Sequence, residues 1–227
     1  MSAPISIIIP TLNDAVRIGP TLAALTEGLH AGLIAELILS DGGSSDDIAE
    51  VAEAAGAELV TGPAGRGPQL IKGITAARGA WLLVLHADSC PEHGWPEAAR
   101  AHMADHPGKA GYFDLRFDVS GCAPRWVAGW ANLRSRWFGL PYGDQGLLLS
   151  RALYDQTGGY RAIPLMEDVA FSRALKGLLR PLGHRIVTSA IRYQSQGWLR
   201  RGGRNLLTLL LYRLGRDPAR LVEKYRR

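Results

Sequence analysis

Short runs of apolar residues alternate along the first half of the chain with longer segments in which apolar residues recur every three or four positions. The short runs are typical of strands in a parallel sheet covered on both faces, and the longer segments are typical of amphipathic helices. The predicted strands cover residues 5–9, 36–40, 58–60 and 81–85, and the predicted helices cover residues 15–33, 45–55 and 68–78. This order predicts right-handed strand–helix–strand units and an α/β fold with a mostly parallel sheet flanked by helices.

The second half of the chain is less regular. Its predicted strands cover residues 112–119, 146–149 and 185–188, and its predicted helices cover residues 124–138, 151–157 and 168–179. Residues 196–227 are predicted to form a basic helical tail. Since no repeat, low-complexity segment or linker interrupts the chain, we expect a single domain over residues 1–227, with residues 1–110 and 111–195 as its two halves.

The composition is that of an ordinary globular protein with one core, since 47% of the 227 residues are hydrophobic and 21% are charged. The longest apolar segment, residues 205–215, is shorter than the roughly 18 residues that a membrane-spanning helix needs. The first residues lack the basic segment of a signal peptide. The chain has two cysteines, Cys90 and Cys122. These features favour a reducing, cytoplasmic location.

The charge is unevenly distributed. Residues 1–110 contain 13 acidic and 6 basic residues, whereas residues 192–227 contain 2 acidic and 10 basic residues. A basic end can attract phosphates, anionic lipid or nucleic acid, or it can be a solvated helix face. No nucleic-acid recognition motif is present, so nucleic acid is not an expected partner. The leucines of residues 206–214 either lie on a membrane surface, such as the inner membrane face, or pack on the domain, which we favour.

Acidic and polar clusters follow three predicted strands, at residues 11–14, 40–46 and 86–88, and a fourth cluster occurs at residues 143–146. In open α/β sheets, ligands bind beyond the carboxyl ends of strands. A single such acid is most often a helix cap, and Ser45 and Asp46 are predicted to cap the helix that follows them. Asp41 is either a turn former or a ligand contact.

Two common nucleotide motifs are missing. A Rossmann dinucleotide site needs Gly-x-Gly-x-x-Gly after the first strand, but residues 10–14 are Pro-Thr-Leu-Asn-Asp. A P-loop needs a lysine after its glycines, and residues 62–68 lack it, although Arg66 could meet a phosphate. NAD, FAD and ATP hydrolysis are therefore not expected.

Taken together, these clusters resemble those of family 2 inverting glycosyltransferases. The resemblance is carried, in order, by residues 7–14, 41–46, 65–70, 86–88 and 166–168, which read IIIPTLND, DGGSSD, GRGPQL, HAD and MED. It implies the GT-A fold, a single Rossmann-like sheet whose first half binds a nucleotide sugar and whose second half binds the acceptor. The segment 211–215, with Pro218 and Tyr225, resembles a small soluble bacterial subfamily of this family.

The resemblance assigns roles to particular positions. It implies a donor site that contains Pro10, Thr11, Asp14, Asp41, Arg66, Lys72, Ala87 and Asp88. In that site Asp41 matches a carboxylate that reads the base edge, which favours a UDP-linked donor. Arg66 and Lys72 match positions that face the diphosphate and the sugar, and their charges suit that role. Lys72 could instead be a solvated helix lysine.

The family's Asp-x-Asp motif occurs here with His86 in place of its first acid, followed by Asp88. Residues two apart in an extended chain lie roughly 6.6 Å apart and face the same way, so both can turn toward one cation. A divalent ion, Mn²⁺ or Mg²⁺, is the cofactor that the motif implies, and imidazole weakens the case for Mg²⁺. Alternatively, His86 is a hydrogen-bonded core histidine.

Inverting transfer needs one carboxylate base, and Asp168 matches it. Its neighbour Glu167 is a second candidate catalytic residue, since repulsion between the two acids could keep one of them protonated and poised for proton transfer. Alternatively, the pair could simply cap the helix and compensate its dipole. Asp144 and Gln145 are plausible contacts to the acceptor or the sugar. Three tryptophans of the predicted helix 124–138 could stack on a sugar or lipid, but helical spacing favours a core position; they are Trp126, Trp130 and Trp137.

The expected function is transfer of a single sugar from a nucleoside diphosphate sugar to an acceptor hydroxyl, with inversion. The acceptor is unknown, and a lipid-linked acceptor is one option. Polymerisation is not expected, because residues 196–200 lack the Gln-x-x-Arg-Trp motif of processive members. Two alternatives stay open: a catalytically degenerate protein that binds nucleotide sugar or anionic lipid, and a nucleotidyltransferase, although its basic glycine-rich loop is missing.

Overall fold

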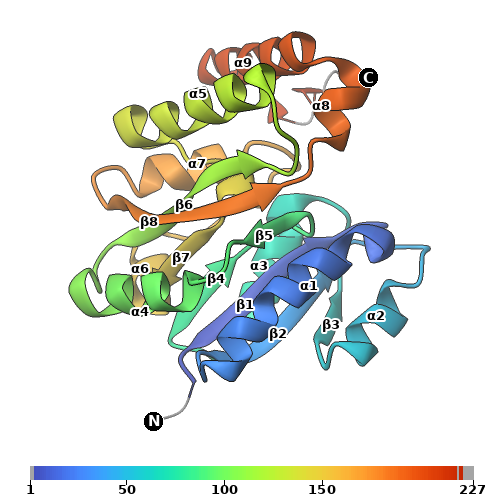
Figure 1. Cartoon of the computed structure of the whole chain (residues 1–227), viewed down its shortest axis with the longest axis vertical. Coiled ribbons are helices and arrows are strands. Elements are labelled where there is room, and N and C mark those ends of the chain that lie inside the picture. Colours follow the sequence, from blue (N-terminus) through green and yellow to red (C-terminus); the bar gives the residue numbers. More distant parts are fainter. Residues whose placement is uncertain (1–2, 219, 222–227) are drawn as a thin grey trace.

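The computed structural model describes residues 3–218, 220 and 221, and shows a three-layer α/β molecule (Figure 1). Tyr225, to which the sequence analysis drew attention, lies outside the described residues, as does the end of the predicted tail. The strands are β1 (Ile5–Thr11), β2 (Ile34–Asp41), β3 (Glu58–Thr61), β4 (Trp81–Val84), β5 (Ser89–Pro91), β6 (Ala110–Phe117), β7 (Leu147–Ser150) and β8 (Leu179–Thr188).

The helices connect these strands. They are α1 (Ala15–His30), α2 (Ile48–Ala54), α3 (Arg66–Ala76), α4 (Trp95–Asp105), α5 (Cys122–Phe138), α6 (Arg151–Gln156), α7 (Glu167–Ala174), α8 (Ile191–Gln196) and α9 (Trp198–Arg213), with a 3₁₀ turn η1 (Gly143–Gln145). The α/β prediction is confirmed.

One eight-stranded sheet holds strands from both halves of the chain, in the order β3-β2-β1-β4-β7-β6-β8-β5. Strands β1 to β4 are parallel to one another, as are β6 and β8, whereas β7 is antiparallel to both of its neighbours. Strand β5 follows β4 in sequence but pairs with β8 at the far edge of the sheet. The chain therefore crosses the sheet directly after β4, and residues 85–88 lie on that crossing.

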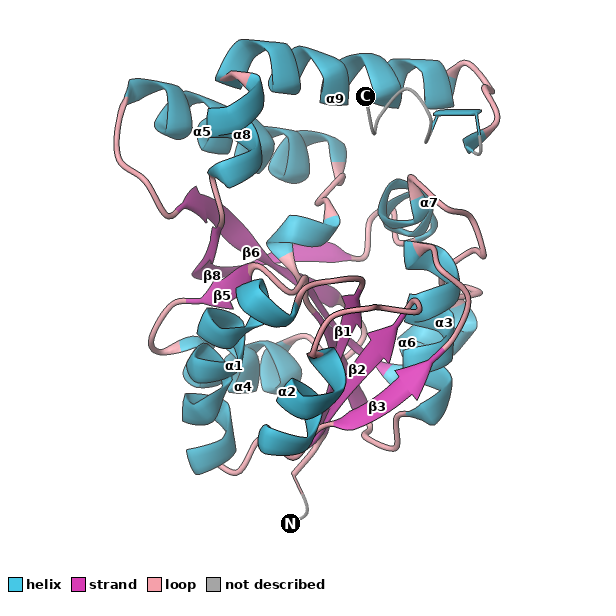
Figure 2. Ribbon diagram, turned by 90° about the vertical axis from the view of Figure 1, so that its right-hand side faces the viewer, coloured by secondary structure: helices cyan, strands magenta, loops and turns pink. Residues whose placement is uncertain are grey.

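Alternate side chains of β1 enter the two cores because successive side chains of a strand point to opposite faces. Ile5, Ile7 and Ile9 pack with α1, α2, α4 and α5, while Ile8 packs with α3, α6 and α7. The two groups of helices lie on opposite sides of the sheet (Figure 2). All four isoleucines are fully buried, so β1 is covered on both faces, as the apolar run predicted.

Some predicted elements differ from the observed ones. Helix α4 and strand β5 were not predicted, because the apolar positions of α4 are mainly alanines and β5 has only three residues. The predicted helix 168–179 ends at Ala174, and β8 begins at Leu179 rather than residue 185. Both cysteines are free in the described part of the chain.

The tryptophans of α5 are not core residues. Trp126, Trp130 and Trp137 are 67%, 45% and 74% exposed, so the prediction that they face the core is wrong. The core-facing side of α5 is instead made of small residues such as Ala128 and Ala131. Small side chains let the helix approach the sheet closely, and the tryptophans then lie on its outer side.

Candidate active site

The loops that follow β1 and β2 are joined by hydrogen bonds. Asn13, with a positive φ of 55°, donates its N–H to the Ser44 hydroxyl at 2.8 Å and accepts from the Ser45 N–H at 2.9 Å. Asp46 accepts from the Ala15 N–H at 2.8 Å and thereby caps α1. The prediction that Ser45 and Asp46 cap the helix following them is wrong, because α2 begins without a side-chain cap from any described residue.

Asp41 is a turn former. Its carboxylate, 4% exposed, accepts hydrogen bonds from the Gly43 and Ser44 N–H groups, both at 2.8 Å, and from the hydroxyls of Ser44 and Thr11. Burial opposes its ionisation, but the hydrogen bonds from Ser44 and Gly43 outweigh burial and lower the pKa of Asp41. Four donors use the lone pairs of the carboxylate, so this geometry favours the turn alternative over the predicted contact to a base edge.

Gln69 holds the carboxyl ends of two strands together, a role that the sequence analysis missed. Its side-chain amide donates to the carbonyls of Thr11 and Ser40 at 2.6 and 2.9 Å. Its oxygen accepts from the Gly65 N–H at 3.3 Å, which fixes the loop before α3. These contacts join residues up to 58 positions apart, and no local pattern in the sequence reports them.

A cavity of about 390 Å³ lies beyond the carboxyl ends of β1 and β4, and we call it the strand-end cavity. Its lining includes the predicted residues Pro10, Thr11, Asp14, Arg66, His86, Ala87 and Asp88. It is completed by Leu12, Gly65, Gln69, Pro164, Leu165, Arg192, Gln196 and Arg201. The fold therefore brings together most of the predicted donor site.

Lys72 lies elsewhere. Its ammonium group donates to the Thr61 carbonyl at the end of β3, and its aliphatic chain lies against Gly62. The side chain is exposed and outside the strand-end cavity. This placement favours the alternative of a solvated helix lysine over the predicted role at the diphosphate.

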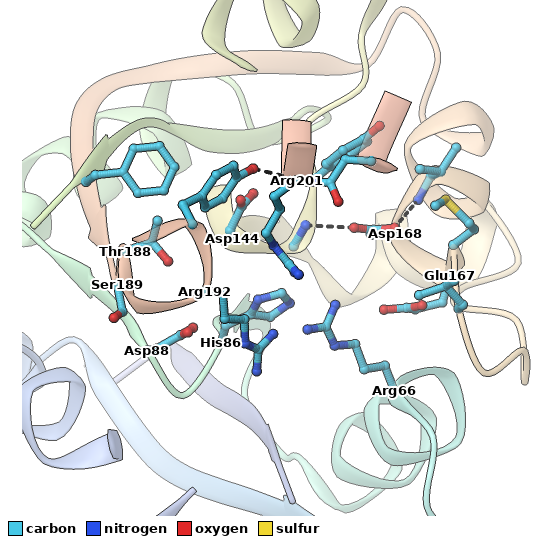
Figure 3. A pocket seen from close by; sticks show the side chains of 18 residues that line it. Arg66, His86, Asp88, Asp144, Glu167, Asp168, Thr188, Ser189, Arg192 and Arg201 are labelled. Atoms are coloured by element: carbon cyan, nitrogen blue, oxygen red, sulfur yellow. Dashed lines mark hydrogen bonds between the residues drawn. The ribbon is translucent and has the colours of Figure 1, made fainter. Parts of the chain in front are cut away.

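A second cavity of about 100 Å³ adjoins the first, and we call it the carboxylate cavity (Figure 3). Asp88, Asp144, Glu167 and Asp168 bring four carboxyl groups to it. The two cavities share Arg66, His86, Asp88, Leu165, Arg192 and Arg201. The shared residues form the passage between the cavities. Three of them are arginines and one is an acid, Asp88, so an anion in that passage would lie beside three positive charges and one negative charge.

The imidazole of His86 packs against the turn at Gly143. A β-carbon added at Gly143 would lie 2.2 Å from its Nε2, so only glycine fits beside the ring. Burial, then the positive charges of Arg66 and Arg192, hold the pKa of His86 well below its ordinary value. Because Nε2 faces Gly143, the geometry favours the alternative of a packed histidine over the predicted metal ligand.

Helix α7 begins with two acids in different environments. Asp168 is half-buried and accepts hydrogen bonds from the Gly143 N–H at 2.9 Å and from the Val169 N–H at 2.7 Å. Glu167 is 1% exposed, and its Oε2 has no hydrogen-bond partner among the described residues. Burial, and then the charge of Asp168, raise the pKa of Glu167 to about 7. One carboxylate is thus oriented by the backbone, and the other is kept partly protonated.

Asp144 lies at the inner side of the carboxylate cavity. Its Oδ1 is buried and has no hydrogen-bond partner in the described part of the chain. Burial raises the pKa of Asp144 to about 6, with the charges of Asp168 and Asp88 adding to the effect and Arg134 opposing it. A buried acceptor without a donor suits a ligand hydroxyl, which agrees with the predicted contact to acceptor or sugar.

Gln145, by contrast, is structural. It is fully buried, and its oxygen accepts from the Ser135 hydroxyl at 2.6 Å and from Arg134 at 3.2 Å, while its amide donates to the Phe113 carbonyl at 3.1 Å. These contacts join α5, β6 and η1. The prediction that Gln145 contacts acceptor or sugar is therefore not supported by its position, because all its polar atoms bond within the protein.

Several cavity residues were missed by the sequence analysis. Thr188 and Ser189 reach the carboxylate cavity because β5, directly after Asp88, pairs with β8 and places Ser89 opposite Thr188. Arg192 and Arg201 enter the passage from α8 and α9. The only signal in the sequence was the basic character of residues 192–227, which does not say which arginines turn inward.

Whether the site fits a divalent cation depends on the oxygen and nitrogen ligands that its side chains offer. The described residues contain no group of three or more His, Cys, Asp or Glu side chains that could hold a metal ion. Asp88 lines both cavities and offers one carboxylate. Cations such as Mg²⁺ are commonly held by one or two carboxylates together with substrate phosphates. The site therefore fits a cation bound together with a diphosphate, and not a cation held by the protein alone.

The fold and the site together define the class of protein to which this chain belongs. A mostly parallel sheet with a polar cavity at its strand ends, adjoining a cavity lined by carboxyl groups, is the arrangement of a glycosyltransferase of GT-A type, as the motifs implied. The chain belongs to Glycosyl transferase family 2, whose model matches residues 6–164. That match covers most of the residues that line the strand-end cavity and most of the sheet.

Solved structures agree on the fold. Glucosyl-3-phosphoglycerate synthase from Mycobacterium tuberculosis, in complex with Mn²⁺, UDP and glucosyl-3-phosphoglycerate, matches with a TM-score of 0.63 and 20% identity. The match covers 94% of this chain and 80% of that chain. Staphylococcus aureus TarS in complex with UDP-GlcNAc matches with a TM-score of 0.62 and 15% identity, over 83% of this chain and 58% of that chain. A search of curated proteins finds no significant match.

Among the helices that the structure describes, none is both long enough and apolar enough to cross a membrane.

Proposed function

We propose that this protein transfers a single sugar from a UDP-linked donor to an acceptor hydroxyl, with inversion at the anomeric carbon. The observation that carries the proposal is the meeting of two cavities at Arg66 and Asp88, with Asp168 in the second cavity. Membership of family 2 supports the reaction class. The structural relatives support the donor, since their complexes contain UDP-glucose or UDP-GlcNAc.

The strand-end cavity is the proposed nucleotide site. Pro10, Thr11 and Asp14 line its β1 side and would contact the base and ribose. Arg66 at the first position of α3 and Arg192 on α8 border the passage to the second cavity. Guanidinium groups form paired hydrogen bonds with phosphate oxygens, so these arginines would hold the diphosphate and stabilise it as the leaving group.

Asp168 is the proposed base. In inverting transfer, the acceptor oxygen attacks the anomeric carbon as a carboxylate takes its proton and the diphosphate leaves from the opposite side. The N–H groups of Gly143 and Val169 each bond one oxygen of Asp168, which fixes the plane of the carboxylate. Each oxygen keeps a lone pair for the acceptor proton. Glu167, partly protonated beside it, limits the negative charge near the reacting carbon.

A divalent cation fits this scheme as a partner of the diphosphate. When bound, it would neutralise charge that develops on the leaving group. Asp88 would hold it, and the Mn²⁺ in the complexes of the mycobacterial relative supports this cofactor. The arginines of the passage act on the same charge, so we expect cation and guanidinium groups to contribute together.

One alternative has a specific observation in its favour. A protein that binds nucleotide sugar without turnover would explain why His86 replaces an acid and packs against Gly143. Such a protein would bind the donor but would release no UDP in the presence of any acceptor. The oriented carboxylate of Asp168 favours the enzyme, because binding alone does not require a positioned base.

The experiment is a thermal unfolding series with UDP, GDP, UDP-glucose and UDP-GlcNAc, each with Mn²⁺, Mg²⁺ or EDTA. A ligand at about 100 times its dissociation constant adds roughly 2.7 kcal/mol, or about 5–10 °C in Tm for a chain of this size. We expect the uridine nucleotides to raise Tm and GDP to have little effect. A larger shift with Mn²⁺ than with EDTA supports the cation. Equal, negligible shifts for every nucleotide would contradict the proposed donor site.

A further inference from the structure

A third cavity, of about 220 Å³, lies between α5 and α9, and we call it the helical cleft. The two helices run beside each other at one end of the molecule, next to β6 and β8 (Figure 1). The cleft is lined by Leu115, Val127, Trp130, Ala131, Arg134, Phe138, Leu140, Tyr142, Asp144, Tyr193, Gly202, Asn205, Leu206, Leu209 and Arg213. Most of these side chains are apolar or aromatic.

The outer part of the cleft leaves large apolar side chains in water. Trp130 on α5 is 45% exposed, Phe138 at the end of the same helix is 57% exposed, and Leu206 on α9 is 54% exposed. Exposed apolar groups that line a concave surface are typical of ligand grooves. An apolar ligand would gain the free energy of covering them.

The inner end of the cleft opens on the proposed reaction site. Tyr142, Asp144, Tyr193 and Asn205 line both the cleft and the carboxylate cavity. Asp144 contributes the buried Oδ1 that no described donor bonds. The inner end of the cleft is therefore polar, and large exposed apolar groups lie elsewhere along it, together with the two arginines Arg134 and Arg213.

We propose that the helical cleft binds the apolar chain of an amphiphilic acceptor, whose hydroxyl group then lies in the carboxylate cavity near Asp168. This inference rests on the proposed function and specifies its acceptor class: an alcohol or sugar carried on an alkyl or isoprenoid chain. The continuity of the cleft with the carboxylate cavity supports a substrate chain as its occupant. A flat membrane surface could cover the exposed side chains but would not fill the cleft.

The first test measures binding of n-alkyl β-glucosides with hexyl, heptyl, octyl and nonyl chains, each below its critical micelle concentration, by calorimetry. One buried methylene contributes about 0.8 kcal/mol, which corresponds to about fourfold in affinity. We expect the affinity to rise by about fifteenfold for every two methylenes until the cleft is filled. An affinity independent of chain length would overturn the proposal.

The second test uses two glycines of α9. A β-carbon at Gly202, which lines the cleft, or at Gly203, which does not, would meet no described atom within 4 Å. Gly202→Leu should fill the cleft and weaken octyl glucoside binding by at least tenfold. Gly203→Leu is the matched control, because it raises helix propensity by the same amount but lies outside the cleft. The Gly203→Leu protein should bind octyl glucoside as tightly as the unchanged protein does.

The outcomes separate this inference from the proposed function. Equal binding by both variants would overturn the cleft as the site. Binding to anionic or neutral vesicles without binding of monomeric glucosides would overturn it in favour of a membrane surface. UDP stabilisation of the Gly202→Leu protein, measured in parallel, reports the donor site alone. Chain-length-dependent binding without any nucleotide binding would support the cleft and contradict the proposed transferase reaction.

Discussion

At the scale of single residues, neighbouring acids acquire different chemistry from their surroundings. Asp168 and Glu167 are adjacent in sequence, but two backbone N–H groups bond the carboxylate of Asp168, whereas Oε2 of Glu167 is buried without a described donor. The motif predicted an acidic pair. The family resemblance gave Asp168 as the expected base, and the folded chain adds the two hydrogen bonds that orient its carboxylate.

Replacing the proposed base should stop transfer and spare donor binding. We expect Asp168→Asn to lower kcat by about 10²–10⁴, because proton removal by a positioned group contributes about that much. Stabilisation by UDP should persist, since Asp168 lies outside the strand-end cavity. Asp155→Asn, at an exposed acid of α6, is the control and should leave kcat unchanged. Full activity of a folded Asp168→Asn protein would show that another group is the base.

Glu167 should make the protein less stable at higher pH. Its pKa is about 7 in the folded state against an ordinary 4.5, so between these values the folded state keeps a proton that the unfolded state has lost. The free energy of unfolding therefore falls as pH rises from about 4.5 to 7, and it stays reduced above about pH 7. We expect Glu167→Gln to increase the free energy of unfolding at about pH 8 by on the order of 1–3 kcal/mol.

Urea unfolding at several pH values would measure this effect. As a control, Glu53→Gln at an exposed position should not change the pH dependence of the free energy of unfolding. If Glu167→Gln and the unchanged protein show the same pH dependence, the buried carboxyl is not protonated in the folded state.

At the scale of elements, the contact between the loop after β4 and the turn η1 positions the base. His86 of that loop packs against Gly143 at the start of η1, and the N–H of Gly143 bonds Asp168 on α7. Three segments far apart in sequence therefore depend on one glycine. A β-carbon there would have to displace either the imidazole or the turn.

We expect Gly143→Ala to destabilise the protein by about 1–3 kcal/mol, a typical cost of overpacking. Adding His86→Ala should restore part of this loss, because the alanine pair leaves room for the β-carbon. Thermal unfolding of both single variants and the double variant measures the coupling. Gly129→Ala, where a β-carbon meets open space in α5, should be neutral or slightly stabilising. Additive effects of the two substitutions would contradict the contact.

At the scale of the whole molecule, the fold determines where the unevenly distributed charges of the sequence lie. The first 110 residues are acidic and residues 192–227 are basic. Folding brings α8 and α9 over the strand ends, so that Arg192 and Arg201 face Arg66 across the passage (Figure 3). Three arginines thus lie where a diphosphate would bind, and their charges favour an anion there.

Donor binding should therefore depend on salt. We expect a rise from about 0.05 to 0.5 M NaCl to weaken UDP binding severalfold, because screening acts on the arginine–phosphate attraction. Uridine, which lacks the diphosphate, should bind more weakly and lose little affinity over the same range. Calorimetric titration of both ligands gives the comparison. Parallel salt dependence for UDP and uridine would show that the arginines do not hold the phosphates.

The sequence by itself determined the class of fold and the outline of the donor site. Apolar runs and helical spacing depend on neighbouring residues, and therefore the first four strands, the first three helices and the loops between them could be predicted. The family motifs identified Pro10, Thr11, Arg66 and Asp88, which the fold gathers in one cavity. The same reasoning missed α4, whose buried positions, Trp95, Pro96, Ala99 and His102, include a histidine and give a weak hydrophobic pattern.

Only the tertiary structure decided which side chains are available to a ligand. Asp41 and Gln145 have the chemistry of ligand contacts, but the donors packed around them use their polar atoms inside the protein. Trp130 has helical spacing typical of a core residue, yet it lines an open cleft because alanines occupy the inner face of α5. Arg201 reaches the site from the far end of the chain. Such contacts depend on packing between distant segments, which a local sequence pattern does not encode.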